Sequence, residues 1–500
     1  MSNGWGGKWV VDRLRLSLAT DSPASPLALT DLVGLALRRN PRRTHLLVSS
    51  VLGKHVPTDP AIVYGAGRLL GALAADFICG RDSGVAEAGA ALLRSALKGS
   101  PDAALALLRR CAEHADRPPA GWRLIAESVT VLGYAETATA LGHAVADALG
   151  ADYLHSTRRR PPGLPEAGGF EEEHSHATRH LLFPEDATML ARGGPLLLVD
   201  DELSTGKTAL NTIVALHARA PRSRYVIATL VDLRSAVDRA RMASLAASLR
   251  VDISVVALAK GHLELPTDAA SVGQQLVREH DVAADSPTGR TAPRRLSLTG
   301  WTGVREGGRH GFNRHDRAAL RGAANEVAEN AAGGFTGDRV LVLGFEELMY
   351  APLLIATRLK DLLAGSADIR FSSTTRSPVV AVDDPGYAIR TRLTFPSHDD
   401  PADGPGLRFA YNVAPGSDRA RRFTDILFIV DDAGDTAELY APGGLLDQLA
   451  GCCDQVHLLT LPTHLPLPEP MLCPPPPPAC QNPSTDRALE AMTAMRSPGS

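Results

Sequence analysis

The chain has 500 residues, 44% of them hydrophobic and 22% charged, and its 52 Lys and Arg against 56 Asp and Glu leave a net charge of −4. This ordinary globular composition allows about two to four domains, and a charge so near zero argues against a protein that coats nucleic acid. We see no apolar run that approaches the roughly 20 residues of a membrane span, and the six cysteines have neither disulfide-framework nor metal-ligand spacing. We therefore expect a cytoplasmic protein with reduced cysteines, without nucleic-acid or membrane partners.

The first part of the chain alternates strands with helices. The predicted segments are, in chain order, a strand over 9–18, a helix over 30–40 capped by Thr30, a strand and glycine-containing loop over 44–57, a helix over 61–77, two short helices within 82–116, a strand over 121–129, a helix over 136–150, a strand–loop–helix over 195–220, a strand over 224–232, a helix near 234–249 and a strand over 251–259. Strands that alternate with helices pair in parallel. The pattern predicts an α/β fold with a parallel sheet and flanking helices.

A second α/β pattern follows a polar stretch, rich in Pro, Gly and Arg, at 282–296. Its predicted segments are 338–365, 368–390, 425–435 and a last strand at 456–461. From about 463 the chain is too rich in proline to bury a core. We therefore predict three parts: a first α/β domain over 1–282, a second over 283–462 and a disordered tail over 463–500.

The most informative motif is LLLVDDELSTGKT, residues 196–208. Four apolar residues end in Asp200 and Asp201, and a short loop of small residues then opens a helix. Such a loop directs successive backbone N–H groups to one point at the positive end of a helix, which suits a phosphate. Gly206 permits close approach of the backbone.

Three interpretations of this motif are open. A nucleoside triphosphatase loop needs a glycine where this chain has Asp201, and two acids there would repel a triphosphate. A sugar monophosphate fits better, because carboxylates accept hydrogen bonds from vicinal hydroxyls while the loop amides hold the phosphate. A plain turn without a ligand would not explain the paired acids, because buried charges are costly unless they have partners.

At these residues the chain closely resembles the PRPP-binding segment of type I phosphoribosyltransferases. The resemblance implies that Asp200 and Asp201 bind the ribose hydroxyls and are the catalytic residues. It implies a 5′-phosphate loop made of Glu202, Leu203, Ser204, Thr205, Gly206, Lys207 and Thr208. It also implies Mg²⁺ as cofactor, held mainly by PRPP itself, and no dedicated protein ligands are assigned to the metal.

Such a transferase also needs a site for the leaving pyrophosphate. In the family this site is usually a loop after the first core strand. The loop with Gly53, Lys54 and His55 lies where that loop is expected, although a plain surface loop is the alternative. Arg158 and Arg159 belong to a run of three arginines that matches the family's second basic loop, although such runs are more often solvated. The loop at 133–139 precedes a helix, and both a ligand-binding and a capping role are open for it.

The segment FEEEHSHATRH, residues 170–180, contains Glu173, His174, His176 and His180. These side chains suit a transition metal. The segment also lies where these transferases carry a mobile lid, and titration of histidine near neutral pH would suit a lid that meets polyanions. We favour the lid over the metal site and over a solvated loop.

The second half contains TRSP at 375–378, after a predicted strand. With the upstream motif, this resembles a bacterial family that joins an orotate-phosphoribosyltransferase-like domain to a TRSP domain. Members occur in tellurium-resistance (ter) gene neighbourhoods and are thought to help make a nucleoside-like metabolite. Glu346 and Glu347 end another strand, so together with Thr375, Arg376 and Ser377 they predict a second binding site of unknown ligand.

The resulting hypothesis is a PRPP-dependent transferase that moves 5-phosphoribosyl to a base-like acceptor and releases pyrophosphate. A PRPP-binding regulator without turnover is one alternative, and a bifunctional enzyme with a second active site in the TRSP half is another. A homodimer is compatible with the resemblance, because related transferases commonly dimerise. The acceptor is not predicted, since the base-binding part of these enzymes carries no transferable motif.

Overall fold

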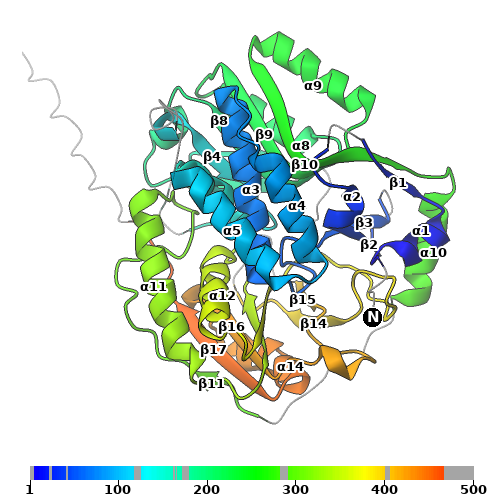
Figure 1. The fold of residues 1–500 in the computed structure, drawn as a ribbon, viewed down its shortest axis with the longest axis vertical. Helices are drawn as coiled ribbons and strands as arrows, with labels where there is room; N and C mark the ends of the chain where they lie inside the picture. Colours follow the sequence, from blue (N-terminus) through cyan, green and yellow to red (C-terminus); the bar gives the residue numbers. More distant parts are fainter. Residues whose placement is uncertain are drawn as a thin grey trace, which may run out of the picture. The chain divides into compact units, whose positions relative to one another are not determined.

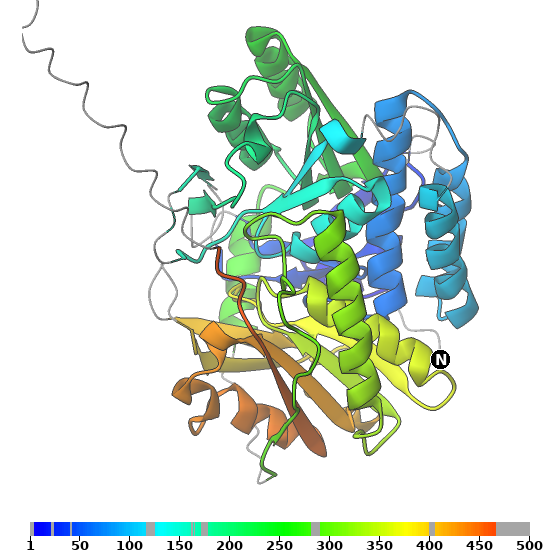
Figure 2. The same cartoon turned by 90° about the vertical axis from the view of Figure 1, so that its left-hand side faces the viewer.

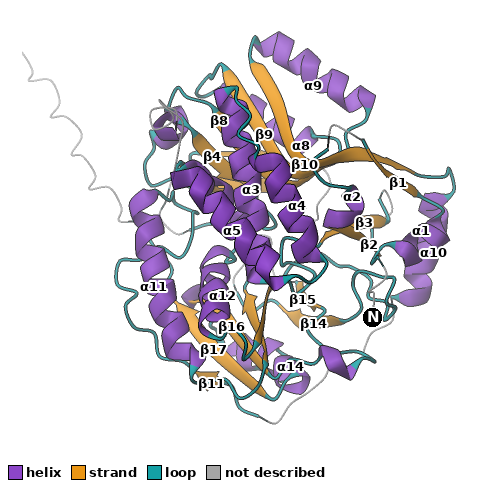
Figure 3. Ribbon diagram, in the orientation of Figure 1, coloured by secondary structure: helices purple, strands orange, loops and turns teal. Residues whose placement is uncertain are grey.

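The computed structural model describes residues 5–21, 25–40, 43–116, 126–161, 164, 166–171, 179–281, 291–399 and 406–466. The chain divides into two compact units, Met1–His464 and Leu465–Ser500. Both large sheets belong to the first unit (Figures 1 and 3). The predicted domain boundary near 282 and nearly all of the predicted tail lie outside the described residues, so the predicted division into domains stays a prediction.

The first sheet has six strands in the order β1-β10-β9-β8-β4-β5. Its strands are β1 (Ser17–Thr20), β4 (Thr130–Gly133), β5 (Asp152–His155), β8 (Leu196–Leu203), β9 (Arg224–Asp232) and β10 (Asp252–Glu264). All neighbours pair in parallel except β1, which runs antiparallel to β10 at the edge. The carboxyl ends of β4, β5 and β8 therefore meet at one edge, where ligands bind in such sheets.

Helices flank this sheet. They are α3 (Pro60–Cys79), α4 (Val85–Leu97), α5 (Pro101–Asp116), α7 (Thr139–Leu149), α8 (Lys207–His217), α9 (Ala236–Leu249) and α10 (Ala269–His280). Figure 1 shows α3, α4 and α5 packed side by side. The length of α3 and its mean hydropathy of 1.5 would also suit a membrane span, contrary to our expectation that no apolar run comes near that length. However, 78% of its most apolar stretch is buried inside the protein.

The second sheet is parallel throughout, with the order β11-β17-β16-β12-β13 (Figure 2). Its strands are β11 (Arg294–Arg295), β12 (Arg339–Gly344), β13 (Asp368–Ser373), β16 (Asp425–Asp431) and β17 (Gln455–Leu461). Its helices are α11 (Arg314–Ala332), α12 (Tyr350–Leu362), α13 (Ala437–Tyr440) and α14 (Leu445–Cys452). The predicted mixed α/β fold with parallel sheets and flanking helices is confirmed.

Three antiparallel hairpins complete the described elements around these sheets: β2 (Val33–Leu37) with β3 (His45–Ser49), β6 (Gly168–Glu171) with β7 (Arg179–Leu182), and β14 (Arg392–Pro396) with β15 (Leu407–Tyr411). The β2–β3 hairpin is a sheet of its own. The loop that follows it at 51–57 therefore does not continue a strand of the first sheet, although the sequence predicted a loop after the first core strand.

Three predicted elements are wrong or displaced. Residues 9–18 form α1 (Lys8–Leu14) and then β1, because Trp9, Val10 and Leu14 bury one side of a helix. Residues 30–40 form only the short α2 (Leu29–Leu32) before β2, since pairing with β3 buries all five residues of that strand. The strand predicted at 121–129 appears instead as β4, and residues 117–125 lie outside the described part.

The two halves of this unit share a hydrophobic core and are joined by ion pairs. One cluster of buried apolar residues includes Leu132 and Val199 of the first sheet as well as Val342 of the second. The buried carboxylate of Asp147 in α7 lies 3.4 Å from Arg317 Nε in α11. The second half is therefore packed directly against the first within this unit.

Candidate functional site

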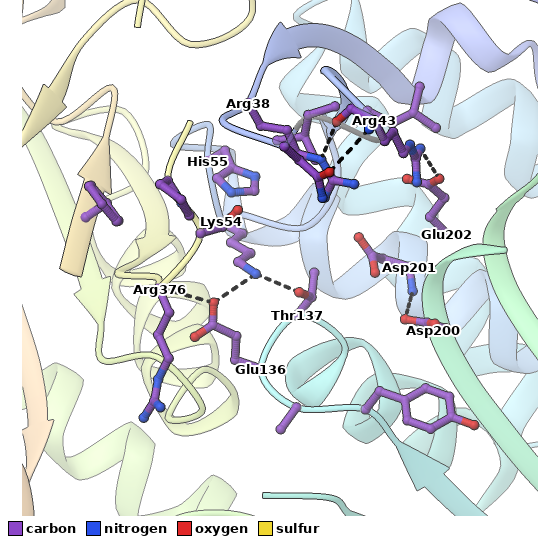
Figure 4. Close-up of a pocket in the computed structure, with 18 of the residues that line it drawn as sticks. Arg38, Arg43, Lys54, His55, Glu136, Thr137, Asp200, Asp201, Glu202 and Arg376 are labelled. Atoms are coloured by element: carbon purple, nitrogen blue, oxygen red, sulfur yellow. Dashed lines mark hydrogen bonds and ion pairs between the residues drawn. The ribbon is translucent and has the colours of Figure 1, made fainter. Parts of the chain in front are cut away.

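A cavity of about 650 Å³ lies at the carboxyl edge of the first sheet (Figure 4). Segments from both halves of the chain line it. Its charged wall residues are Arg38, Arg39, Arg43, Lys54, Arg158, Arg376 and Arg408 against Glu136, Asp200, Asp201 and Glu202. Some of these cations have acid partners behind the wall, Asp281 for Arg39 and Glu346 for Arg376 and Arg408. The mixture of cations and carboxylates suits a polyanion that also presents groups for carboxylates to bind.

Asp200 and Asp201 lie in the second half of β8 and line the cavity. The backbone N–H of Asp201 donates to Asp200 Oδ1 at 3.0 Å. Burial raises the pKa of Asp201 and the neighbouring Glu202 adds to the rise, while Lys54 opposes it. A bound cation or hydroxyl donor would favour the ionised form of this acid.

The loop after β8 runs into helix α8 beside the two acids. Ser204, Thr205 and Thr208 line the cavity, and Gly206 has φ 75°, a left-handed conformation that favours glycine. The side chain of Leu203 is buried beneath the loop, and Lys207 begins the helix without lining the cavity. The loop therefore lies at the N-terminus of α8, the end of a helix that favours anions. Three of the seven residues predicted for phosphate binding bring hydroxyls to the cavity.

Glu202 has a partner that the sequence did not predict. Its carboxylate forms an ion pair with Arg43, which follows β2 in the first hairpin. Arg38, labelled in Figure 4, and Arg39 lie in the same segment and also line the cavity. These arginines are not among the site residues predicted from the sequence, although the cluster RRNPRR at 38–43 indicates a concentration of positive charge.

The loop at 51–57 contributes Lys54 and His55 to the cavity wall. Lys54 Nζ donates to Thr137 Oγ1 at 2.6 Å and lies 3.0 Å from Glu136 Oε1. Burial, together with the charge of Lys54, lowers the pKa of His55 to about 3, so its ring is neutral at pH 7. Lys54 can thus bring charge to a bound anion, whereas His55 can offer only a neutral hydrogen bond.

Gly53 lies behind that wall. Its φ is 62°, and a Cβ there would come within 2.4 Å of the Phe371 ring in β13. This glycine therefore allows the loop to pack closely on the second half, and it is not among the residues that line the cavity.

The loop after β4 is the segment whose role the sequence left open. Tyr134, Ala135, Glu136 and Thr137 all line the cavity, because β4 is the neighbour of β8 in the sheet. The peptide bond between Ala135 and Glu136 is cis. Burial tends to raise the pKa of Glu136, but Lys54, the Thr375 hydroxyl and Arg376 outweigh it and lower the pKa to about 2. The loop therefore places a permanent negative charge beside Lys54.

The two arginines after β5 have different surroundings. Arg158 lines the cavity. Arg159 does not: its guanidinium pairs with Asp431 and lies 3.4 Å from Asp399, with its charge 5.0 Å from the centre of the Phe345 ring. Pyrophosphate binding predicted for Arg159 therefore has no geometric support, because its charge is satisfied within the second half.

The histidine-rich segment is described only in part. Glu173, His174 and His176 lie outside the described residues, so the lid stays a prediction. His180 lies in β7, buried; its Nδ1 is 2.8 Å from Ser156 Oγ, and its ring stacks on Phe170. It forms part of the cavity wall. In the described part of the chain, no group of three or more His, Cys, Asp and Glu side chains could hold a metal ion.

The residues predicted to form a second site lie in or beside the cavity that contains Asp200 and Asp201. Arg376 and Ser377 line the same cavity as Asp200 and Asp201, and Arg408 and Phe409 join them from β15. Glu346 is buried, and its carboxylate pairs with Arg376 at 2.7 Å and with Arg408. Thr375 and Glu347 are buried and bind residues of the first half.

Glu347 gives a testable pH dependence. Burial favours its neutral form, but Arg309, His155, Arg159 and the N–H of Arg158 outweigh burial and lower its pKa to about 2. Its stabilising contribution is thus present above the unfolded pKa of about 4.3 and is lost as the pH falls toward 2. We expect acidification from pH 6 to pH 3 to cost the wild type about 2 kcal/mol more of unfolding free energy than Glu347→Gln.

Urea unfolding of both proteins at the two pH values measures this difference. Glu264→Gln is the matched control, because the Glu264 side chain is 73% exposed and should leave the pH dependence unchanged. An equal loss of stability in wild type and Glu347→Gln would show that the buried carboxylate is not held in its ionised form.

Comparison with known protein families matches two successive stretches of the chain. The sequence profile of a phosphoribosyl transferase family matches residues 32–262. The profile of the TRSP domain, which lies C-terminal to that transferase domain, matches residues 306–449. No curated protein gives a significant match.

Several solved structures are also similar. An adenine phosphoribosyltransferase from Rhodothermus marinus is 22% identical, over 32% of this chain and 81% of its own, with a TM-score of 0.21. The enzyme from Giardia lamblia complexed with 9-deazaadenine is 19% identical over the same shares, with a TM-score of 0.22. The enzyme from Trypanosoma brucei in complex with AMP, pyrophosphate and ribose-5-phosphate is 14% identical, over 26% of this chain and 55% of its own, with a TM-score of 0.19.

Proposed function

The chain belongs to the family that joins a phosphoribosyl transferase domain to a C-terminal TRSP domain, and from this we propose that it transfers the 5-phosphoribosyl group of PRPP to a base-like acceptor and releases pyrophosphate. The observation that carries the proposal is the arrangement of one cavity: the paired acids and phosphate loop after β8 lie across from Lys54 and the loop after β4. This arrangement supports separate positions for the phosphate, the ribose and the pyrophosphate of one ligand.

Each place has its own chemistry. The amides and hydroxyls at 204–208 hold the 5-phosphate at the positive end of α8. The carboxylates of Asp200 and Asp201 accept hydrogen bonds from the ribose hydroxyls and face the ring where positive charge develops as the bond to pyrophosphate breaks. Lys54 and Thr137 donate to the departing pyrophosphate. Such preplaced charges are usually the largest contribution to catalysis.

Magnesium fits this cavity as a companion of PRPP. The carboxylates of Asp200 and Asp201 are oxygen ligands of the kind that Mg²⁺ prefers, and Mg²⁺ commonly takes few protein ligands beside substrate phosphates. When bound, it would neutralise charge on the pyrophosphate. The chain's own residues would orient the ribose and hold the phosphate.

The biosynthetic setting rests on the resemblance alone. We propose that the product is a nucleoside-like metabolite, that the protein works in the cytoplasm as part of tellurium resistance, and that it is a homodimer. The acceptor is the component to identify first.

Pyrophosphate release from PRPP and Mg²⁺, measured with a panel of bases and with deproteinised cell extract, tests the proposal. We expect release that depends on an acceptor, together with a phosphoribosylated product detectable by mass spectrometry. PRPP binding without release for any acceptor would favour a PRPP-binding regulator. Absence of PRPP binding would contradict both.

A further inference from the structure

The TRSP motif lies in the wall of the cavity, and three loops of the first half that shape this wall are held by residues of the second half. Resting on the proposed function, we infer that the second half is a positioning element for the pyrophosphate side of the transferase site, and that Thr375 is a positioning residue. On this account the two halves build one active site.

The first contact joins Thr375 to the loop after β4. The Thr375 hydroxyl donates to Glu136 Oε1, and the backbone N–H of Arg376 lies 3.4 Å from the same oxygen. Glu136 in turn pairs with Lys54 (Figure 4). Thr375 itself is fixed, because its backbone bridges to Phe409 and its hydroxyl accepts from the N–H of Ser377 at 3.2 Å. The motif therefore sets where the carboxylate of Glu136, and hence the ammonium of Lys54, can lie.

The second contact holds the backbone around Lys54. Thr58 and Phe371 exchange two backbone hydrogen bonds of 2.9 and 2.8 Å, so the loop adds to the edge of β13. The hydroxyl of Ser372 donates to the carbonyl of Lys54 at 3.2 Å, and Asn412 Nδ2 donates to the carbonyl of His55 at 2.8 Å. The loop that carries the cation is thus anchored to the second half at several atoms.

The third contact holds the loop after β5. Glu347, three residues after the end of β12, accepts from the Thr157 hydroxyl at 2.7 Å and from the N–H of Arg158 at 2.8 Å. Arg158 lines the cavity. Strand ends of the second sheet therefore bind the loops after β4 and β5 of the first sheet directly.

All three contacts lie on the side of Lys54, Thr137 and Arg158. Around β8, Glu202 pairs with Arg43, the N–H of Asp201 donates to Asp200, and the N–H of Lys207 donates to Thr205, so these contacts all lie within the first half. Loss of the hydrogen bond from Thr375 should therefore weaken binding of pyrophosphate groups and leave binding of ribose 5-phosphate unchanged. This difference between ligands separates positioning from a general loss of structure.

Thr375→Val and Thr375→Ser form the matched pair of variants. Valine keeps the shape and the backbone bridge and removes the hydroxyl, whereas serine keeps the hydroxyl. The probes, titrated calorimetrically against the full chain with Mg²⁺ present, are PRPP, inorganic pyrophosphate and ribose 5-phosphate. We expect Thr375→Val to lose about tenfold or more in affinity for PRPP and pyrophosphate, as for other hydrogen bonds to a charged group. The same variant should bind ribose 5-phosphate as the wild type does. Thr375→Ser should bind all three probes with wild-type affinity.

Two outcomes would overturn the inference while the proposed function stands. One is unchanged PRPP and pyrophosphate affinity in Thr375→Val. The other is an equal loss for all three probes, since that reports a general structural defect. A wild-type protein that binds neither PRPP nor ribose 5-phosphate would overturn the proposed function itself, and the inference with it.

Discussion

Replacing Asp201 by asparagine is expected to lower the rate of pyrophosphate release by about 10²- to 10³-fold, the usual effect of removing one preplaced electrostatic group, with a much smaller change in PRPP affinity. The amide oxygen of asparagine still accepts a hydrogen bond from a ribose hydroxyl. It lacks the negative charge that faces the ribose as cationic character develops. The loss should therefore fall on the transition state more than on the bound substrate.

Single-turnover rates and calorimetric PRPP affinities of Asp201→Asn check this split. Asp252→Asn is the matched control, because Asp252 begins β10, far from the carboxyl edge of the sheet, and its side chain is half exposed. Near-normal turnover in Asp201→Asn would remove the role assigned to this acid. A fall in PRPP affinity with an unchanged rate at saturating PRPP would make it a binding residue only.

Replacing Gly206 by valine is expected to lower PRPP affinity by more than about a hundredfold. The φ of 75° at this position is costly for any residue with a Cβ, and most of all for a β-branched one. Relief of that strain would turn the backbone N–H groups of 204–208 away from their common point. A phosphate that depends on those amides would lose its site.

Gly80→Val controls for the strain alone. Gly80 ends α3 with φ 65°, and nothing lies within 4 Å of a Cβ built there. Both variants should lose thermal stability, whereas only Gly206→Val should lose PRPP affinity. Retained affinity in Gly206→Val would move the phosphate cradle elsewhere.

The parts of the site that the sequence predicts are those made by one continuous segment. Residues 196–208 contain strand, acids, loop and helix start in order, so their local geometry follows from local rules: apolar strand, polar strand end, small loop, helix. Lys54 was also predicted, although for a reason that the structure corrects, since its loop follows the β2–β3 hairpin and not a strand of the first sheet.

The parts that the sequence does not predict depend on contacts between distant segments. The role of Glu136 is decided by β4 lying next to β8 and by Thr375, which is 239 residues away in the chain. The polar residues that follow β12 and β13 were predicted to form a second site, because their local sequence does not show that they face loops of the first half. Residues 33–37 have the spacing of a helix, and only burial against β3 makes them a strand.

A crystal structure of the full chain with PRPP and Mg²⁺ tests the central claim most directly. The account predicts the 5-phosphate at the amides of 204–208, the ribose hydroxyls on Asp200 and Asp201, and the pyrophosphate beside Lys54 and Thr137. Electron density for PRPP at any other place, or a cavity left empty at saturating PRPP with Asp200 and Asp201 turned away from it, would contradict the account.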